Sequence, residues 1–344
     1  MKRVILALLL LAASVQAQPA VKVGFCAKTI TSAATPFAIA TKMGWYKNVK
    51  VQLVPIAGST DCVKLVATGD LPYSLPSVEP LAPARVQGVK GKIFYTAYQG
   101  NIYGIAVPKE SAVKSLKDLK GKKIGVASMS SGGVPVARGL LAMSGLNPET
   151  DAQIVVVGEA AQAAALLRSG QVAALSLYDT QYALVDSAGV QLRMLDSGPV
   201  ARFPSNGFFA LEETLNKDRA QALELVRGYA MGTVFALANP EAAVKIVFEV
   251  YPQTIPSGKS EEEGLKSEVK TLLARAAHWK LEAGGVKRWG ESSVKDFDAY
   301  QDFLLKWKVI KEKVPATDLV TNDMIDEVNR FDASRIAADA RAYK

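Results

Sequence analysis

The sequence contains very few of the residues that metal and redox sites use. It has one histidine and two cysteines among 344 residues, whereas zinc, haem and iron–sulfur sites bring several such ligands together. A Ser-His-Asp triad would have to use the single histidine, His278, which lies beside Trp279 in a predicted helix and is better suited to a structural or exposed position. We therefore expect no metal and no cofactor.

Long apolar segments are also scarce. The one that stands out, residues 4–13, follows Lys2 and Arg3 and is about half the ~20 residues that a membrane-spanning helix needs. Basic residues, a short apolar run and then small residues at 15–17 are typical of a secretory signal peptide. We predict a signal peptide over residues 1–17, cleaved after Ala17, and a soluble periplasmic protein. No cysteine directly follows the run, so a lipoprotein is not expected.

The charge balance is basic but not concentrated. The chain has 41 Lys and Arg against 33 Asp and Glu, a net charge of +8, and 49% of its residues are hydrophobic. Disordered and collagen-like chains have a different composition. No run of Lys and Arg with interleaved aromatic residues is present, and export would remove nucleic acid as a partner. We expect a compact chain whose scattered positive charge aids solubility, with no nucleic-acid partner.

The chain repeats itself once, at a spacing of 101 residues. The shift carries 22–24 (KVG) onto 123–125 (KIG), and Gly44 and Gly69 onto Gly145 and Gly170. The matched positions mark the same predicted elements in the same order. Strands are predicted over 21–25, 51–56, 71–75, 123–127, 154–157 and 172–177, and helices over 36–43, 61–68, 135–144 and 161–169. Such alternation is typical of βαβ units and predicts two similar α/β lobes, each with a mostly parallel sheet.

Two segments are expected to join the lobes. Residues 101–107 leave the first lobe and residues 205–211 return to it; both are predicted to be hinge strands with a glycine that absorbs a backbone change. Lobe one then comprises residues 18–103 and 206–344, and lobe two comprises 104–205. The C-terminal part is predicted to be helical and to pack on lobe one, with helices over 216–238, 241–250, 261–279, 294–309 and 322–331.

The loops that follow the predicted parallel strands hold the candidate binding residues. In open parallel sheets, ligands bind beyond the carboxyl ends of the strands, where helix N-termini expose free N–H groups. These loops are rich in Ser, Thr, Gly and aromatic residues, and they line one cleft if the lobes face each other. The candidates are Lys28, Thr31, Ser59, Thr60, Ser77, Glu79, Tyr98, Ser128, Ser130, Ser131, Gly132, Tyr178 and Asp179.

Most of these candidates also have an ordinary structural interpretation. Residues 128–133 could present donors to a solute or simply cap the following helix, and Ser59 and Thr60 leave the same two possibilities. Tyr98 and Tyr178 could enclose a flat ring or pack at the rim of the sheets.

The charge of the solute depends on two acidic candidates. If Glu79 and Asp179 face inward, they attract an amine or an aminopyrimidine and repel a sulfonate; the alternative is that both are solvated. Lys28 and Arg202 are the only cations expected near the strand ends. An amine or a pyrimidine-like heterocycle is therefore favoured, with a sulfonate or a carboxylate second.

The two cysteines fit an exported protein. Cys26 follows the first predicted strand and Cys62 opens the helix after the second, so adjacent parallel strands would bring them together. We predict a disulfide between them, with two unpaired buried thiols as the alternative.

Several segments together resemble a known family. They are TSAATPFAIATKMGW (31–45), GSTDCVKLVATGD (58–70), SLKDLKGKKIGVA (115–127), AAALLRSGQVAA (163–174) and the closing stretch 322–344. Their order and spacing are similar to those of bilobal periplasmic solute-binding proteins of ABC importers, in the branch that binds thiamine-pyrimidine precursors, taurine, alkanesulfonates and nitrate. The resemblance implies the type II periplasmic binding fold, a small organic solute and an ABC permease as partners, and a monomer.

Two other functions share this scaffold. Pyrimidine synthases of the yeast type resemble the family, but they need a Cys-rich iron-binding motif and an active-site His, and the sequence has neither. A protein that presents its bound solute to a sensor would use the same closed form as an importer component, and the sequence does not separate these two roles. We expect a binding protein rather than an enzyme.

Overall fold

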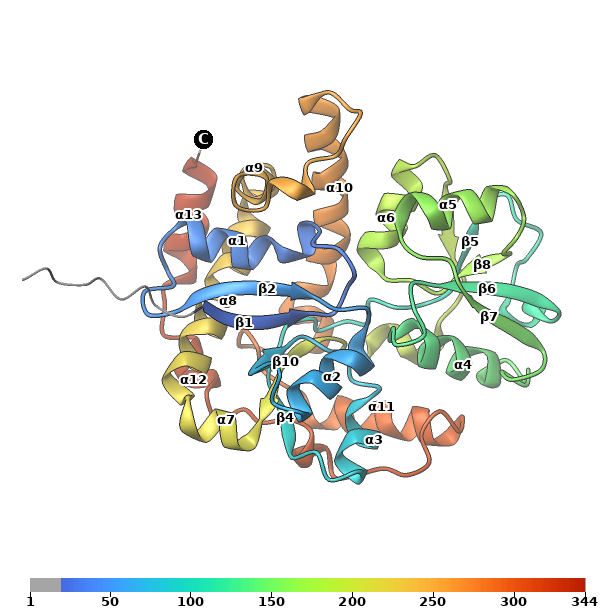
Figure 1. Cartoon of the computed structure of the whole chain (residues 1–344), viewed down its shortest axis with the longest axis horizontal. Coiled ribbons are helices and arrows are strands. Elements are labelled where there is room, and N and C mark those ends of the chain that lie inside the picture. Colours follow the sequence, from blue (N-terminus) through green and yellow to red (C-terminus); the bar gives the residue numbers. More distant parts are fainter. Residues whose placement is uncertain (1–19, 344) are drawn as a thin grey trace, which may run out of the picture.

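The computed structural model describes residues 20–343, so the predicted signal peptide lies outside them. The chain forms two lobes side by side, each built on one sheet flanked by helices (Figure 1). The described residues include no helix whose length and apolar content would let it cross a membrane.

The elements follow the predicted alternation of strands and helices. The first lobe begins with β1 (Ala20–Phe25), α1 (Thr35–Lys42), β2 (Lys50–Pro55), α2 (Ser59–Ala67), β3 (Tyr73–Ser74), α3 (Leu81–Val86) and β4 (Gly91–Thr96). The second contains β5 (Ala106–Pro108), β6 (Lys122–Val126), α4 (Gly133–Met143), β7 (Ala152–Val156), α5 (Ala160–Arg168), β8 (Ala174–Leu175), α6 (Asp179–Ser187) and β9 (Leu192–Met194). The chain closes with β10 (Gly207–Leu211), α7 (Glu212–Lys217), α8 (Arg219–Ala238), α9 (Pro240–Val250), α10 (Glu261–Trp279), α11 (Val294–Lys306), α12 (Ile325–Val328) and α13 (Ala333–Ala342).

The two sheets have matching strand orders. The first runs β2-β1-β3-β10-β4 and the second β7-β6-β8-β5-β9. Each has three neighbouring parallel strands and one inserted antiparallel strand, β10 in the first sheet and β5 in the second. The predicted α/β class with two similar, mostly parallel lobes is confirmed.

The 101-residue repeat extends to the pairing of individual residues. Val23 of β1 lies beside Leu53 of β2, and Ile124 of β6 lies beside Ile154 of β7. Both members of the second pair follow those of the first by 101 positions. The two lobes are therefore structural copies with the same register.

The repeated glycine of β1 and β6 has a packing reason. A Cβ atom on Gly24 would lie 2.8 Å from the Cβ of Ser74, and one on Gly125 would lie 2.9 Å from the side chain of Leu175. Leu175 follows Ser74 by the same 101 positions. In both lobes a side chain at this position would meet the neighbouring strand, so only glycine fits.

The lobes exchange one strand each. After β4 the chain crosses to the second sheet and inserts β5 between β8 and β9; after β9 it crosses back and inserts β10 between β3 and β4. The hinge strand predicted within residues 101–107 forms only at its end: Tyr103 makes a single bridge with Tyr178, and β5 begins only at Ala106, so residues 102–105 are not a strand. The chain leaves one sheet here before it joins the other, so no continuous ladder forms. The predicted lobe boundaries fall in the crossings 97–105 and 195–206 and stay a prediction.

The C-terminal helices reach both lobes. Helices α8 and α9 pack on α1 of lobe one, as expected, and α13 packs on α8. However, α10 also packs against α6 of lobe two (Figure 1), and Phe303 of α11 lies against Gly139 of α4. The predicted packing of the tail on lobe one is therefore confirmed, and α10 and α11 contact lobe two in addition.

Some predicted bounds in the tail also differ. The helix expected over 216–238 is divided at Asp218 into α7 and α8, and the one expected over 322–331 shrinks to α12. The predicted helix 261–279 coincides with α10.

The predicted disulfide is confirmed. Cys26 and Cys62 are bonded, with their Cα atoms 6.0 Å apart. The bond joins the end of β1 to the first turn of α2 and so fixes two of the predicted binding loops relative to each other.

Candidate functional site

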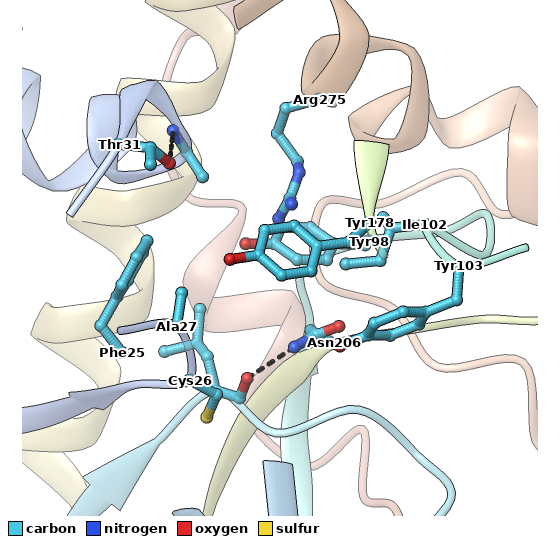
Figure 2. Close-up of a pocket in the computed structure, with 12 residues that line it drawn as sticks. Phe25, Cys26, Ala27, Thr31, Tyr98, Ile102, Tyr103, Tyr178, Asn206 and Arg275 are labelled. Carbon is cyan, nitrogen blue, oxygen red and sulfur yellow. Dashed lines mark hydrogen bonds between the residues drawn. The ribbon is translucent and has the colours of Figure 1, made fainter. Parts of the chain in front are cut away.

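A small cavity lies between the lobes, and four aromatic side chains line it together with mostly small and apolar residues (Figure 2). About 30 Å³ of this cavity is accessible to water, which is space for two or three water molecules. Its lining residues are Phe25, Cys26, Ala27, Thr31, Ala33, Leu75, Tyr98, Ile102, Tyr103, Tyr178, Asn206 and Arg275.

The lining comes from strand ends, from both crossings and from the tail. Phe25 ends β1, Tyr98 and Tyr103 belong to the first crossing, and Asn206 belongs to the second. Tyr178 directly precedes α6 of lobe two. The cavity therefore has walls from both lobes and lies at the place where the chain passes between them.

A buried ion pair closes one side of the cavity. Arg275 of α10 donates from Nε and from one terminal nitrogen to the two carboxylate oxygens of Asp179, at 2.7 and 2.5 Å. The two side chains are only 3% and 6% exposed. Burial lowers the pKa of Arg275, but the Asp179 carboxylate, with smaller contributions from Tyr98 and Tyr229, holds the pKa above its ordinary value. The pair joins the tail, which packs on lobe one, to the first residue of α6 in lobe two.

The histidine lies next to this pair. His278 Nε2 is 4.0 Å from Asp179 Oδ2, and burial lowers the pKa of the imidazole below its ordinary value. At neutral pH the ring is therefore uncharged, and Arg275 is the cation that compensates Asp179.

Three of the sequence-predicted residues line the cavity. They are Thr31, Tyr98 and Tyr178. The Thr31 hydroxyl accepts a hydrogen bond from the Ala33 N–H, so it also caps a short turn. As the sequence predicted, the two tyrosines follow strands of opposite lobes: Tyr98 follows β4 and Tyr178 follows β8.

The predicted serine loop of lobe two touches lobe one directly. Ser128 Oγ donates to the Ala57 carbonyl at 2.6 Å, and the Thr60 N–H donates to the Ser130 carbonyl at 3.1 Å. Ser131 is buried behind these contacts. The loops predicted to face one cleft are thus brought together, and here they contact each other rather than line the cavity.

Two glycines allow this close approach of the lobes. A Cβ on Gly58 would lie 2.4 Å from the Ser130 carbonyl, and a Cβ on Gly132 would lie 2.5 Å from Ser77 Oγ. Gly58 has a φ of 174°, an extended conformation that any residue adopts. The opposite lobe, not the backbone angle, is what requires glycine at position 58.

Glu79 and Ser77 are buried with unused hydrogen-bonding capacity. Ser59 Oγ accepts from the Ser77 N–H, and Tyr300 donates to Glu79 Oε1 at 2.6 Å. Ser77 Oγ and Glu79 Oε2 have no partner among the described residues. Glu79 is 3% exposed, and burial raises the pKa of its carboxyl group above the ordinary value. The alternative that Glu79 is solvated is therefore wrong.

The cations expected near the strand ends point elsewhere. The side chains of Lys28 and Arg202 are exposed. The Lys28 N–H and the Thr29 hydroxyl both donate to Glu159 of lobe two, at 3.3 and 2.9 Å. Tyr178 donates to the same carboxylate at 2.8 Å. Glu159, which the sequence did not single out, therefore receives hydrogen bonds from both lobes.

The sequence also missed the cavity residues Phe25, Tyr103, Asn206 and Arg275. For Arg275 a signal existed: Glu268, Thr271 and Arg275 recur at helical spacing and are all buried. A polar stripe on the inner face of a helix needs partners, and this one faces residues near the cavity.

We predict that the stability of the Glu79→Gln variant, relative to that of the wild type, increases as the pH rises. The raised pKa of the carboxyl group means that its contribution to the free energy of unfolding is most favourable below its unfolded value of about 4.5 and is lost as the pH rises through the folded value. Glutamine does not titrate, so the melting temperature of the variant minus that of the wild type should become more positive over this range. The exposed Glu149→Gln serves as the control, and a pH-independent difference for Glu79→Gln would contradict the prediction.

We also predict that Gly58→Ala prevents full contact of the lobes without disturbing either lobe. The added methyl group meets the Ser130 carbonyl, whereas the backbone of residue 58 tolerates alanine. In the presence of a solute that closes the lobes, small-angle scattering should show a larger radius of gyration than for Gly264→Ala, whose new methyl group makes only ordinary contacts. Equal radii for the two variants under that condition would show that this contact does not form when the lobes close.

Comparison with known proteins adds the family. Residues 31–243, more than half of the chain, match the family model described as NMT1/THI5 like. A protein of Chloroflexus aurantiacus named riboflavin-binding protein RibY is 21% identical over 294 residues, which cover 84% of this chain and 82% of that protein.

Solved structures share the fold. A protein of Bordetella bronchiseptica RB50 superposes with a TM-score of 0.68 at 21% identity, covering 90% of this chain and 96% of the other. The alkanesulfonate-binding protein SsuA of Xanthomonas axonopodis, bound to MOPS, gives 0.65 at 17% identity, with 89% and 99% covered. The periplasmic binding protein fold implied by the sequence is thereby confirmed, and the chain belongs to the NMT1/THI5-like family.

Proposed function

We propose that the protein is the periplasmic substrate-binding component of an ABC importer, which takes up a small solute between its lobes and delivers it to a membrane permease. The observation that carries the proposal is the cavity at the crossings, with walls from both lobes. A solute there contacts both lobes and stabilises the closed form by its differential contacts. The permease would then recognise the closed surface.

The lining of the cavity favours binding over catalysis. Of its twelve described residues, none is a His, Asp or Glu, and Cys26 is held in a disulfide. General acid–base and nucleophilic catalysis usually use such groups within reach of the substrate. A tyrosine-rich cavity can hold a molecule and orient it without changing it.

The solute that fits best is a flat heterocycle. Aromatic surface in the cavity comes from both lobes and the first crossing, through Phe25, Tyr98, Tyr103 and Tyr178. Such rings bind planar molecules by stacked and edge contacts. The name of the relative RibY, a riboflavin-binding protein, is compatible with this class.

The pairing of Asp179 with Arg275 changes the argument about charge. It leaves Asp179 unavailable to an amine, and Glu79, the other acidic candidate, does not line the cavity. A flat pyrimidine-like heterocycle therefore stays the first choice and an amine does not, and a sulfonate, as in the printed name of SsuA, or a carboxylate stays the second.

A thermal-shift screen tests the proposal. The panel contains riboflavin, 4-aminopyrimidine, taurine, MOPS and nitrate, and we expect one class to raise the melting temperature in a saturable way, because selective binding to the native state stabilises it by about 2.7 kcal/mol at a hundredfold excess over Kd. The compound should be recovered intact. Turnover of the compound, or no response to any member, would contradict the proposal.

Tyr178→Ala should weaken binding of the compound by about 10-fold or more, since one wall of the cavity is lost. Tyr251→Ala, at the end of α9 and outside the cavity lining, is the matched control and should bind as the wild type does. Equal affinity in both variants would place the binding site elsewhere.

A further inference from the structure

Arg275 is the one charged side chain among the described residues that line the cavity. It comes from α10, far along the chain from every strand-end loop, and is 3% exposed. Its guanidinium carbon lies 4.1 Å from the centroid of the Tyr98 ring. Figure 2 shows the side chain descending from its helix toward Tyr98 and Tyr178. A positive charge is thus held against an aromatic wall of the proposed binding site.

Asp179 occupies only one edge of this guanidinium group. The carboxylate accepts from Nε and from one terminal nitrogen of Arg275. Among the described residues, no hydrogen bond from the other terminal nitrogen is found. An arginine has five N–H donors in a fixed planar arrangement, so donors remain on the edge that Asp179 does not use.

We propose that Arg275 is a specificity-determining residue that offers these remaining donors to an acceptor oxygen of the solute, and that Asp179 is a positioning residue that holds the guanidinium group in place. The inference rests on the proposed function and names the solute class more closely. The solute is a flat ring that carries a carbonyl, carboxylate or sulfonate oxygen at its edge. A ring that carries only an ammonium group is disfavoured.

The surroundings of Asp179 support its role as a positioning residue. Asp179 does not line the cavity, and its carboxylate also accepts the Thr180 N–H at 2.7 Å. Its other titratable neighbours are His278, which is uncharged at neutral pH, and the buried tyrosines Tyr98 and Tyr182, whose pKa values burial raises. A bidentate pair fixes both the position and the plane of an arginine, and stacking on Tyr98 adds a second constraint. The guanidinium group is therefore preorganised before any solute arrives.

Three probes with the same ring test the inference. Benzoate and benzamide carry acceptor oxygens, whereas benzylamine carries an ammonium group. Their binding to the wild-type protein is measured by saturation-transfer NMR and by thermal shift at millimolar concentration. We expect benzoate and benzamide to bind and benzylamine to bind at least about 10-fold more weakly, the size of effect expected when a charged donor finds no acceptor. This comparison needs no variant.

Arg275→Lys keeps the charge but loses the planar donor edge. It should weaken benzoate and benzamide by about 10-fold or more, whereas the exposed Arg168→Lys should have no effect. Asp179→Asn leaves the positive charge but releases its orientation, so it should weaken the uncharged benzamide more than benzoate. A purely structural role of Asp179 would weaken both probes equally. Circular dichroism and the melting temperature of each variant without probe show whether it is folded.

The outcomes separate this inference from the proposed function. Preference for benzylamine, equal binding of all three probes, no binding of any, or unchanged affinity in Arg275→Lys would overturn the role of Arg275. The thermal-shift panel described under the proposed function is judged separately. If no compound class in that panel binds, the proposed function itself is overturned.

Discussion

Within residues 20–343 the two sheets share no hydrogen-bonded strands, and the rest of the structure depends on this. Over that part of the chain, the backbone passes between the lobes only at residues 97–105 and 195–206. These crossings have two tasks. In the proposed function they are the hinges between the lobes, and they supply Tyr98, Tyr103 and Asn206 to the cavity. A solute in the cavity would therefore lie close to the axis of the proposed motion and contact both lobes at once. At this position a small change of the angle between the lobes opens or closes the cavity.

The C-terminal helices add a third link between the lobes, which is packed rather than covalent. Helix α10 carries Arg275 to Asp179, and removing one partner of such a buried pair leaves an uncompensated charge that costs about 3–5 kcal/mol. The pair as a whole is weak evidence for stability. Its value lies in orientation, because it fixes a guanidinium group beside the aromatic wall. Because Arg275 lies in the tail and Asp179 in lobe two, the proposed opening of the lobes either breaks this ion pair or moves α10 together with lobe two. In either case the tail takes part in the proposed equilibrium between open and closed forms.

Much of the fold could be predicted because it is encoded locally and repeated. The glycines at positions 24 and 125, the alternation of strands and helices and the spacing of Cys26 and Cys62 are all visible in the sequence, and the structure confirms what they imply. The residues that line the cavity were predictable only where the rule for strand ends applies, as for Tyr98 and Tyr178. Arg275 lies 96 residues from its partner in sequence, so no local pattern predicts the pair, and the close contact of Gly58 with Ser130 depends on how two lobes meet.

The central claim is that a solute closes the two lobes around itself. Small-angle X-ray scattering of the wild-type protein, with and without a compound that stabilises it, tests this most directly. The account predicts that the radius of gyration falls at saturation to a value close to that of the structure described above, with the lobes together and the cavity widened to hold the compound. A radius of gyration that stays unchanged while the compound is demonstrably bound would contradict it.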